Sequence, residues 1–135
     1  MASQIVIFVD GSCSANPGGT ASYGFVVYKD DVKIHDEFKV VGSGPDMSSN
    51  VAEFAGLGAA LDYALGQGWK EVTIKADSAL LVNQMNGSWR VRRGMYIGWY
   101  EAAKAKAAKF NKIDYVQIPR EKNKAADELA RKGWQ

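Results

Sequence analysis

The chain has 135 residues, of which 47% are hydrophobic and 24% charged, a balance typical of one soluble globular domain. Its formal net charge of +2 is compatible with a polyanionic partner but does not require one. A single cysteine and a single histidine exclude an internal disulfide, a cysteine-based metal cluster and a metal site built from several histidines.

The first predicted element is a strand over residues 5–9. These residues are all apolar and mostly β-branched, and their lack of alternation predicts a strand that is buried on both faces. The strand ends on Asp10, and we expect Gly11 and Ser12 to turn the chain. A carboxylate at the end of such a strand is costly to bury alone, so Asp10 is a candidate functional residue, although Asp-Gly is also ordinary turn chemistry.

A β-hairpin is predicted next, after a loop of small residues at 12–19. Residues 21–28 and 32–41 are rich in apolar and aromatic side chains, and the polar residues between them suit a short turn. Apolar and polar residues alternate along the second of these strands. His35 falls on the face opposite Ile34, and we expect it to point to solvent.

A long amphipathic helix follows, from capping residues at 48–50 to about residue 65, because apolar residues recur there at helical spacing. Residues 71–76 then predict a second strand of the buried type, which also ends on an aspartate, Asp77. The remaining predicted elements are a short helix at 79–86, a helix at 95–110, a strand at 113–118, and a final helix at 124–132 that Asn123 starts.

The order of these elements predicts the arrangement of the sheet. Helices connect the first, fourth and fifth strands, which favours parallel pairing among them, with the hairpin antiparallel at one edge. Asp10 and Asp77 would then lie at the same end of neighbouring strands. Carboxylates held this close repel each other unless a cation lies between them, and Mg²⁺ prefers such oxygen ligands.

Two further acids are candidates for the same site. Glu53 is expected in the first turn of the long helix and Asp127 in the first turn of the last helix, each flanked by apolar residues. Taken alone, each acid is more simply explained as a favourable partner of a helix dipole.

Four motifs together resemble the type 1 ribonuclease H family. They occur in the order and with the spacing of that family, and the resemblance spans residues 4–132. Four ordered motifs are far more specific than any one of them. The motifs are Asp10-Gly11-Ser12 with Asn16-Pro17-Gly18, Ser49-Asn50-Val51-Ala52-Glu53, Asp77-Ser78, and the stretch from Arg120 to Ala130 that contains Asp127.

This resemblance implies an α/β, ribonuclease H-like fold. The expected architecture is a five-stranded mixed sheet, with an antiparallel hairpin plus parallel strands, flanked by helices in one catalytic domain over residues 1–135. The implied activity is hydrolysis of the RNA strand of an RNA–DNA hybrid, leaving 5′-phosphate and 3′-hydroxyl ends.

The resemblance also implies the active site and its cofactor. Asp10, Glu53, Asp77 and Asp127 would bind two Mg²⁺ ions when substrate is present, with Mn²⁺ as an alternative ion. By the same resemblance, Asp10 bridges both ions and Asp127 helps to hold the ion that activates water. Glu53 and Asp77 hold the other ion.

Residues that contact substrate are implied in the same way. Backbone groups of residues 11–13 and two asparagine side chains match positions that detect 2′-hydroxyls, although turn residues and a helix cap would explain them equally well. An aromatic and basic cluster in the loop at 87–94 suits phosphates and sugars, with a solvated loop as the alternative. The candidates are Gly11, Ser12, Cys13, Asn16, Asn50, Trp89, Arg90, Arg92, Arg93 and Arg120.

The chain departs from the family pattern at three places. The loop before Asp127 lacks the histidine of bacterial members and carries Pro119-Arg120, as in the archaeal and plant-like branch, so Arg120 is a candidate substitute. A long basic handle is missing or minimal, which predicts modest, salt-sensitive affinity for the hybrid. Ala79 replaces a glutamine that often contacts the minor groove.

Two alternatives to this activity remain open: a non-catalytic nucleic-acid-binding module on the same fold, and a nuclease that prefers double-stranded RNA. No apolar run approaches the ~20 residues of a membrane span, and residues 1–4 lack the features of a leader. We therefore expect a cytoplasmic protein with an RNA–DNA hybrid as its partner and no membrane contact. No obligate protein partner is evident, and a monomer is expected.

Overall fold

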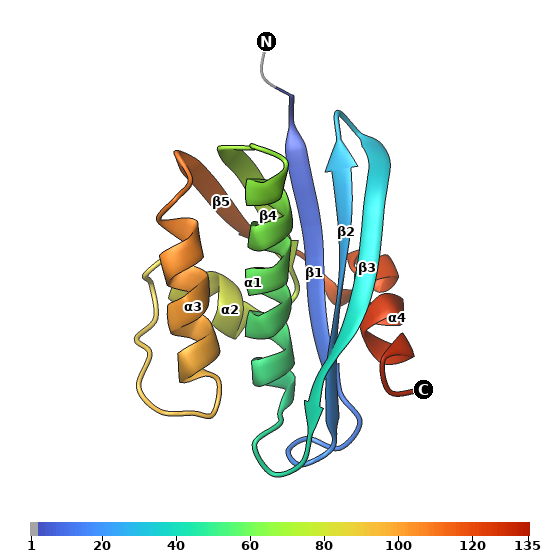
Figure 1. Cartoon of the computed structure of the whole chain (residues 1–135). Coiled ribbons are helices and arrows are strands. Elements are labelled where there is room, and N and C mark those ends of the chain that lie inside the picture. Colours follow the sequence, from blue (N-terminus) through green and yellow to red (C-terminus); the bar gives the residue numbers. More distant parts are fainter. Residues whose placement is uncertain (1–2) are drawn as a thin grey trace.

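The computed structural model describes residues 3–135. Met1 and Ala2, which belong to the segment 1–4 discussed above, therefore lie outside the described residues. Five strands form one mixed sheet in the order β3-β2-β1-β4-β5 (Figure 1). The β1–β2 and β2–β3 pairs are antiparallel, and the β1–β4 and β4–β5 pairs are parallel, which confirms the predicted fold class. The strands are β1 (Ile5–Cys13), β2 (Thr20–Lys29), β3 (Val32–Ser43), β4 (Glu71–Ala76) and β5 (Lys112–Gln117).

Helices cover both faces of this sheet. The long helix α1 packs on β1 and β2, and α3 packs on α1, while the last helix lies behind the sheet in Figure 1. The helices are α1 (Ser49–Gly66), α2 (Ala79–Met85), α3 (Ile97–Ala107) and α4 (Lys124–Lys132), with a short 3-10 helix, η1 (Arg120–Lys122), before α4.

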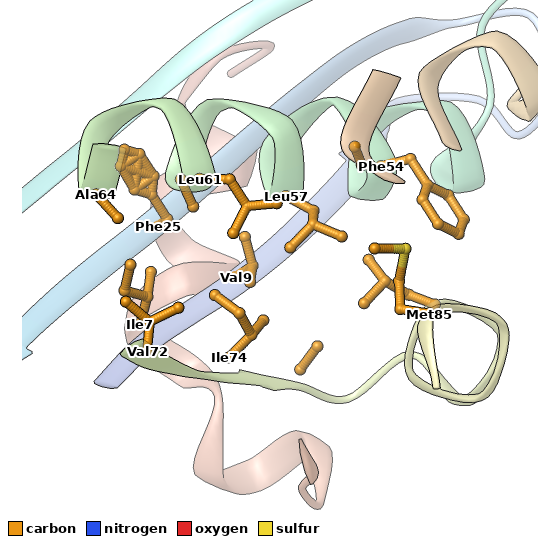
Figure 2. Close-up of a cluster of buried hydrophobic side chains, with 14 of the residues drawn as sticks. Ile7, Val9, Phe25, Phe54, Leu57, Leu61, Ala64, Val72, Ile74 and Met85 are labelled. Carbon is orange, nitrogen blue, oxygen red and sulfur yellow. The ribbon is translucent and has the colours of Figure 1, made fainter. Parts of the chain in front are cut away.

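The main hydrophobic core lies between the sheet and α1. Side chains alternate between the two faces of a strand, so Ile7 and Val9 of β1 point towards α1, where Leu57 and Leu61 bury them completely or almost completely (Figure 2). The opposite face of the same strands meets α4 in a smaller cluster around Val26 and Leu129. Here Phe8 is only partly covered, so β1 is fully buried on one face rather than on both as predicted.

Three expected element boundaries are wrong, one of them the end of the helix expected over 95–110, which ends at Ala107. Residues 11–13 do not turn but continue β1, because their backbone pairs with residues 21–23 of β2. The helix expected from residue 95 begins at Ile97, because the Tyr96 ring turns inwards, stacks on Phe54 at a centroid distance of 5.1 Å and accepts a hydrogen bond from Gln84.

The edge strand β3 also differs from expectation. His35 does not point freely to solvent: it stacks on Tyr63 of α1 at 4.2 Å between ring centroids and hydrogen-bonds to Glu37. Several apolar residues of β3 remain exposed because this edge strand is incompletely covered; they are Val32, Ile34, Phe38 and Val40. Among residues 3–135, no helix is both long and apolar enough to span a membrane.

Candidate active site

Asp10 projects from β1 just beyond the point where this strand stops pairing with β4. The last residues in that parallel register are Phe8 and Lys75, whereas pairing with β2 continues through Asp10 to Cys13. Asp10 lies opposite Gly24 of β2, on the face of the sheet that carries α4. Its side chain is 7% exposed and accepts a hydrogen bond from the Gly11 backbone at 2.9 Å. The surroundings of this carboxylate are therefore decided by the elements that pack around it.

Two glycines allow helices to approach the sheet closely on either side of Asp10. A Cβ on Gly11 would lie 2.3 Å from the backbone nitrogen of Glu53, so glycine is needed for α1 to pass over β1. A Cβ on Gly24 would lie 2.5 Å from Cβ of Leu129, so glycine is equally needed where α4 lies on β2. Because the two helices approach so closely, Glu53 of α1 and Asp127 of α4 lie near the end of β1.

Glu53 and Asp77 join Asp10 at this point. One carboxylate oxygen from each of the three residues lies within 4.8 Å of the other two. Asp77 immediately follows β4, as expected, and Ser78 caps α2 by accepting a hydrogen bond from the Leu81 backbone. Glu53 lies more than one turn into α1 rather than in its first turn, so its position is explained by this site and not by the helix dipole.

Asp127 lies on the other side of Asp10, in the first turn of α4 as predicted. Its carboxylate lies close enough to Asp10 to help raise the pKa of Asp10, and it accepts a hydrogen bond from Arg131 one turn later, at 3.3 Å. The Asp127–Arg131 pair has i,i+4 spacing, so the sequence carried a signal for it. Among the ion pairs of residues 3–135, only Asp127 of these four acids has a cationic partner.

Burial and mutual repulsion hold protons on this cluster. Desolvation, reinforced by the negative charges of Asp77 and Glu53, raises the pKa of Asp10 to about 8. Desolvation also raises the pKa of Glu53 to about 7, against the opposing effect of a hydrogen bond from Ser78. Carboxylates that resist ionising next to one another are a suitable site for a cation, which would replace the protons.

The donor set fits a hard divalent cation. Every candidate ligand atom is a carboxylate oxygen, and three of them already converge within bonding reach of one ion. Cys13 is the one cysteine near the site, and its thiol donates to the Ala15 carbonyl at 3.0 Å. The residues present therefore favour coordination of a cation by oxygen over coordination by a thiolate.

An open cleft of about 680 Å³ surrounds the four acids. Of the predicted substrate contacts, four line this cleft: Gly11, Ser12, Cys13 and Arg120. Sequence reasoning did not propose the other lining residues as functional, although Ser49 belongs to one of the four motifs. They are Ser49, Gln117, Ile118, Pro119, Arg131 and Trp134.

The other predicted substrate contacts lie outside the cleft lining. Asn16 has a structural role, since its side chain accepts a hydrogen bond from the Ser49 backbone at the start of α1. The Asn50 side chain takes part in no hydrogen bond among the described residues, so its contacts assign it no role. The aromatic and basic cluster stands on the exposed loop between α2 and α3, and consists of Trp89, Arg90, Arg92 and Arg93.

Asn123 is a further residue whose part in the site was not predicted. It precedes α4 as expected, but its side chain makes no cap hydrogen bond. Instead its amide donates to the Val9 carbonyl at 2.9 Å and to the Asp77 carboxylate at 3.3 Å. An asparagine before a helix is typical of an ordinary N-cap. Only the structure therefore reveals that Asn123 connects β1, β4 and α4 through its hydrogen bonds.

Comparison with known proteins agrees with this geometry. Residues 8–133 match the family described as "Reverse transcriptase-like". The chain is 38% identical over 129 residues to the "Bifunctional protein Rv2228c" of Mycobacterium tuberculosis. That match covers 94% of this chain but 34% of the relative, so the chain spans about a third of the length of that curated relative.

Solved structures resemble the chain over nearly its whole length. The N-terminal RNase H domain of Rv2228c from Mycobacterium tuberculosis is 36% identical, with a TM-score of 0.88, and the match covers 98% of this chain and 94% of that one. LC11-RNase H1, solved in complex with an RNA/DNA hybrid, is 30% identical, with a TM-score of 0.86 and coverage of 96% and 95%.

Proposed function

The chain belongs to the type 1 ribonuclease H family, and we propose that it is a metal-dependent endoribonuclease that hydrolyses the RNA strand of RNA–DNA hybrids. The observation that carries this proposal is the convergence of Asp10, Glu53 and Asp77 within 4.8 Å, beside Asp127, in an open cleft. A similar protein, LC11-RNase H1, has been solved with such a hybrid.

The four acids would hold two Mg²⁺ ions, with Mn²⁺ as an alternative. Asp10, which lies within 4.8 Å of Glu53 and Asp77 and interacts with Asp127, would help to hold both ions, with Asp127 at one ion and Glu53 and Asp77 at the other. When bound, the ions would lower the pKa of the attacking water and neutralise the scissile phosphate. The side chains would thus need to stay ionised and fixed, and no nucleophilic side chain is required.

The rest of the cleft would bind and orient the hybrid. Gly11, Ser12 and Cys13 form the last pairs of β1 and line the cleft beside Asp10, where they can contact ribose in the shallow minor groove. Arg120 is exposed on η1 at the same cleft and would hold a phosphate or the leaving product. The exposed Trp89 loop would contact the hybrid outside the cleft.

A direct test compares one labelled sequence as RNA–DNA hybrid, double-stranded RNA and double-stranded DNA. Each is incubated with Mg²⁺, Mn²⁺ or chelator, beside the Asp10→Asn variant and a matched surface variant, Asp46→Asn. We expect metal-dependent cleavage of RNA in the hybrid alone, with 5′-phosphate and 3′-hydroxyl ends, abolished by Asp10→Asn only. Binding without cleavage would instead support a nucleic-acid-binding module, and cleavage of double-stranded RNA would support the other nuclease class.

We also propose that residues 1–135 form one catalytic domain. We expect the protein to act in the cytoplasm and to be a monomer. The exposed apolar residues of β3 make the oligomeric state worth measuring. Light scattering after size exclusion, at concentrations used for the cleavage assay, would show a mass near 14.7 kDa for a monomer.

A further inference from the structure

The indole of Trp134 lies at the edge of the cleft and donates a hydrogen bond from Nε1 to Oγ of Ser12 at 3.1 Å. These residues are 122 positions apart in the sequence. Ser12 follows Asp10 by two residues on the same strand, so the two side chains point to the same face of the sheet. The segment after α4 is therefore tied directly to the strand that carries Asp10.

The position of Trp134 depends on the residue before it. Gly133 lies so close to β2 that a Cβ there would be 1.8 Å from Oγ of Ser22 and 3.3 Å from Val40. The Trp134 backbone nitrogen also donates to the Arg131 carbonyl at 3.1 Å. The chain is thus held flat on the β2–β3 hairpin, which places the indole next to the end of β1.

The direction of this hydrogen bond decides what the Ser12 hydroxyl can do. An indole N–H is a donor only, whereas a hydroxyl has one donor hydrogen and two acceptor lone pairs. Because Oγ accepts from Trp134, its own hydrogen must point elsewhere. No acceptor for this hydrogen occurs among the hydrogen bonds of residues 3–135, and Ser12 lines the cleft. The hydroxyl hydrogen is therefore available to a ligand bound in the cleft.

We propose that Trp134 is a positioning residue for ribose recognition, which orients the Ser12 hydroxyl to donate to a 2′-oxygen of the RNA strand. This inference rests on the proposed function and names how one part of the cleft would select RNA. The 2′-hydroxyl accepts hydrogen bonds and is absent from deoxyribose. Ser12 lines the part of the cleft that is proposed to face the shallow minor groove, where the 2′-hydroxyls are displayed.

The test uses hybrids in which a single deoxynucleotide is moved through the RNA strand around one cleavage site. The Trp134→Phe variant keeps an aromatic ring but removes the donor, and Ser12→Ala removes the hydroxyl. Trp99→Phe is the matched control, because Trp99 is exposed on α3 and lies outside the cleft lining. Both kcat/KM and equilibrium binding are measured, and thermal melting verifies that each variant is folded.

For the wild type, we expect that the 2′-deoxy substitution at the position facing Ser12 lowers kcat/KM and affinity by about 2- to 12-fold, the effect of one hydrogen bond. Trp134→Phe and Ser12→Ala should lower both quantities on the all-ribose hybrid by a similar factor and abolish the sensitivity at that position. The double variant should be no worse than Ser12→Ala, because the two residues act through one hydroxyl.

Three results would overturn the inference. They are a Trp134→Phe protein with the wild-type 2′-deoxy pattern, a Ser12→Ala protein that retains sensitivity at every position, or an equal loss for ribose and deoxyribose substrates. A wild-type protein that cleaves no hybrid would instead contradict the proposed function. In that case the binding series still decides the role of Trp134.

Discussion

The side-chain amide of Asn123 lies 3.3 Å from a carboxylate oxygen of Asp77 and donates a hydrogen bond to it. The same amide donates to the Val9 carbonyl at 2.9 Å, one residue before Asp10, and the asparagine side chain is almost completely buried. Its amide oxygen has no hydrogen-bond partner among the described residues. A buried polar atom without a hydrogen bond destabilises the folded protein. Here that loss of stability is offset because the amide holds the ends of β1 and β4, which carry Asp10 and Asp77, in place.

Replacing Asn123 with alanine should therefore impair both stability and metal binding. Loss of buried hydrogen bonds is expected to lower the free energy of unfolding by about 1–3 kcal/mol. Asp77 would lose its fixed orientation, so the dissociation constant for Mn²⁺ should rise. Calorimetric titration and thermal melting measure the two effects, with the exposed Asn111→Ala as control. A variant with wild-type metal affinity would show that Asn123 only stabilises the fold.

Metal binding should strengthen as pH rises from about 6 to about 8. The raised pKa values of Asp10, about 8, and Glu53, about 7, mean that protons occupy these carboxylates at neutral pH. A cation must displace them, so the dissociation constant should fall by about tenfold per pH unit for each proton released. Titrations in buffers of different ionisation enthalpy would measure that release. A dissociation constant that does not change between pH 6 and pH 8 would contradict the proton-holding site.

Asp10 should destabilise the metal-free protein at alkaline pH. Its pKa is about 8 when folded and near 3.8 when unfolded, so the unfolded state binds fewer protons between these values. The free energy of unfolding consequently falls as pH rises from about 4 to about 8. Asp10→Asn should melt at a higher temperature than the wild type at pH 8, where each 1 kcal/mol is worth about 4 °C. The difference should shrink towards pH 4, and a variant that melts below the wild type at pH 8 would exclude this explanation.

Gly11→Ala should disrupt the close approach of α1 to β1. The new Cβ would lie 2.3 Å from the Glu53 nitrogen, which is backbone and cannot rotate away. We expect a loss of about 1–3 kcal/mol in the free energy of unfolding, together with reduced metal affinity because Glu53 is displaced. Gly98→Ala is the matched control, since a Cβ there meets no atom within 4 Å and alanine favours the helix. Equal stability of the two variants would contradict the steric argument.

Arg120→Ala should slow turnover rather than unfold the protein. Arg120 is exposed on η1 and lines the cleft, and no ion pair of the described residues includes it. Removing a charged hydrogen bond to a phosphate is expected to lower kcat by about tenfold or more, while the melting temperature stays the same. Lys109→Ala, exposed beyond the end of α3, controls for lost net charge. Unchanged turnover would remove Arg120 as the substitute for the missing loop histidine.

Sequence reasoning was accurate where the signal is local. The strand Glu71–Ala76 and the helix Lys124–Lys132 begin and end where predicted, because hydrophobic periodicity and capping residues act over a few positions. It failed where a distant partner decides the outcome. Tyr96 leaves the predicted helix for a contact with Phe54, and His35 turns towards Tyr63.

The sequence by itself determined the order of elements, the sheet they form and the four acids, since these follow from local patterns and ordered motifs. The tertiary structure decided which other residues share the site. Asn123 and Trp134 reach it through contacts with β1 that span 114 and 122 residues. Gly11 and Gly24 are needed because a Cβ at either position would clash with the helix that packs on the strand. Such distances arise only when all the layers pack together, so no local pattern encodes them.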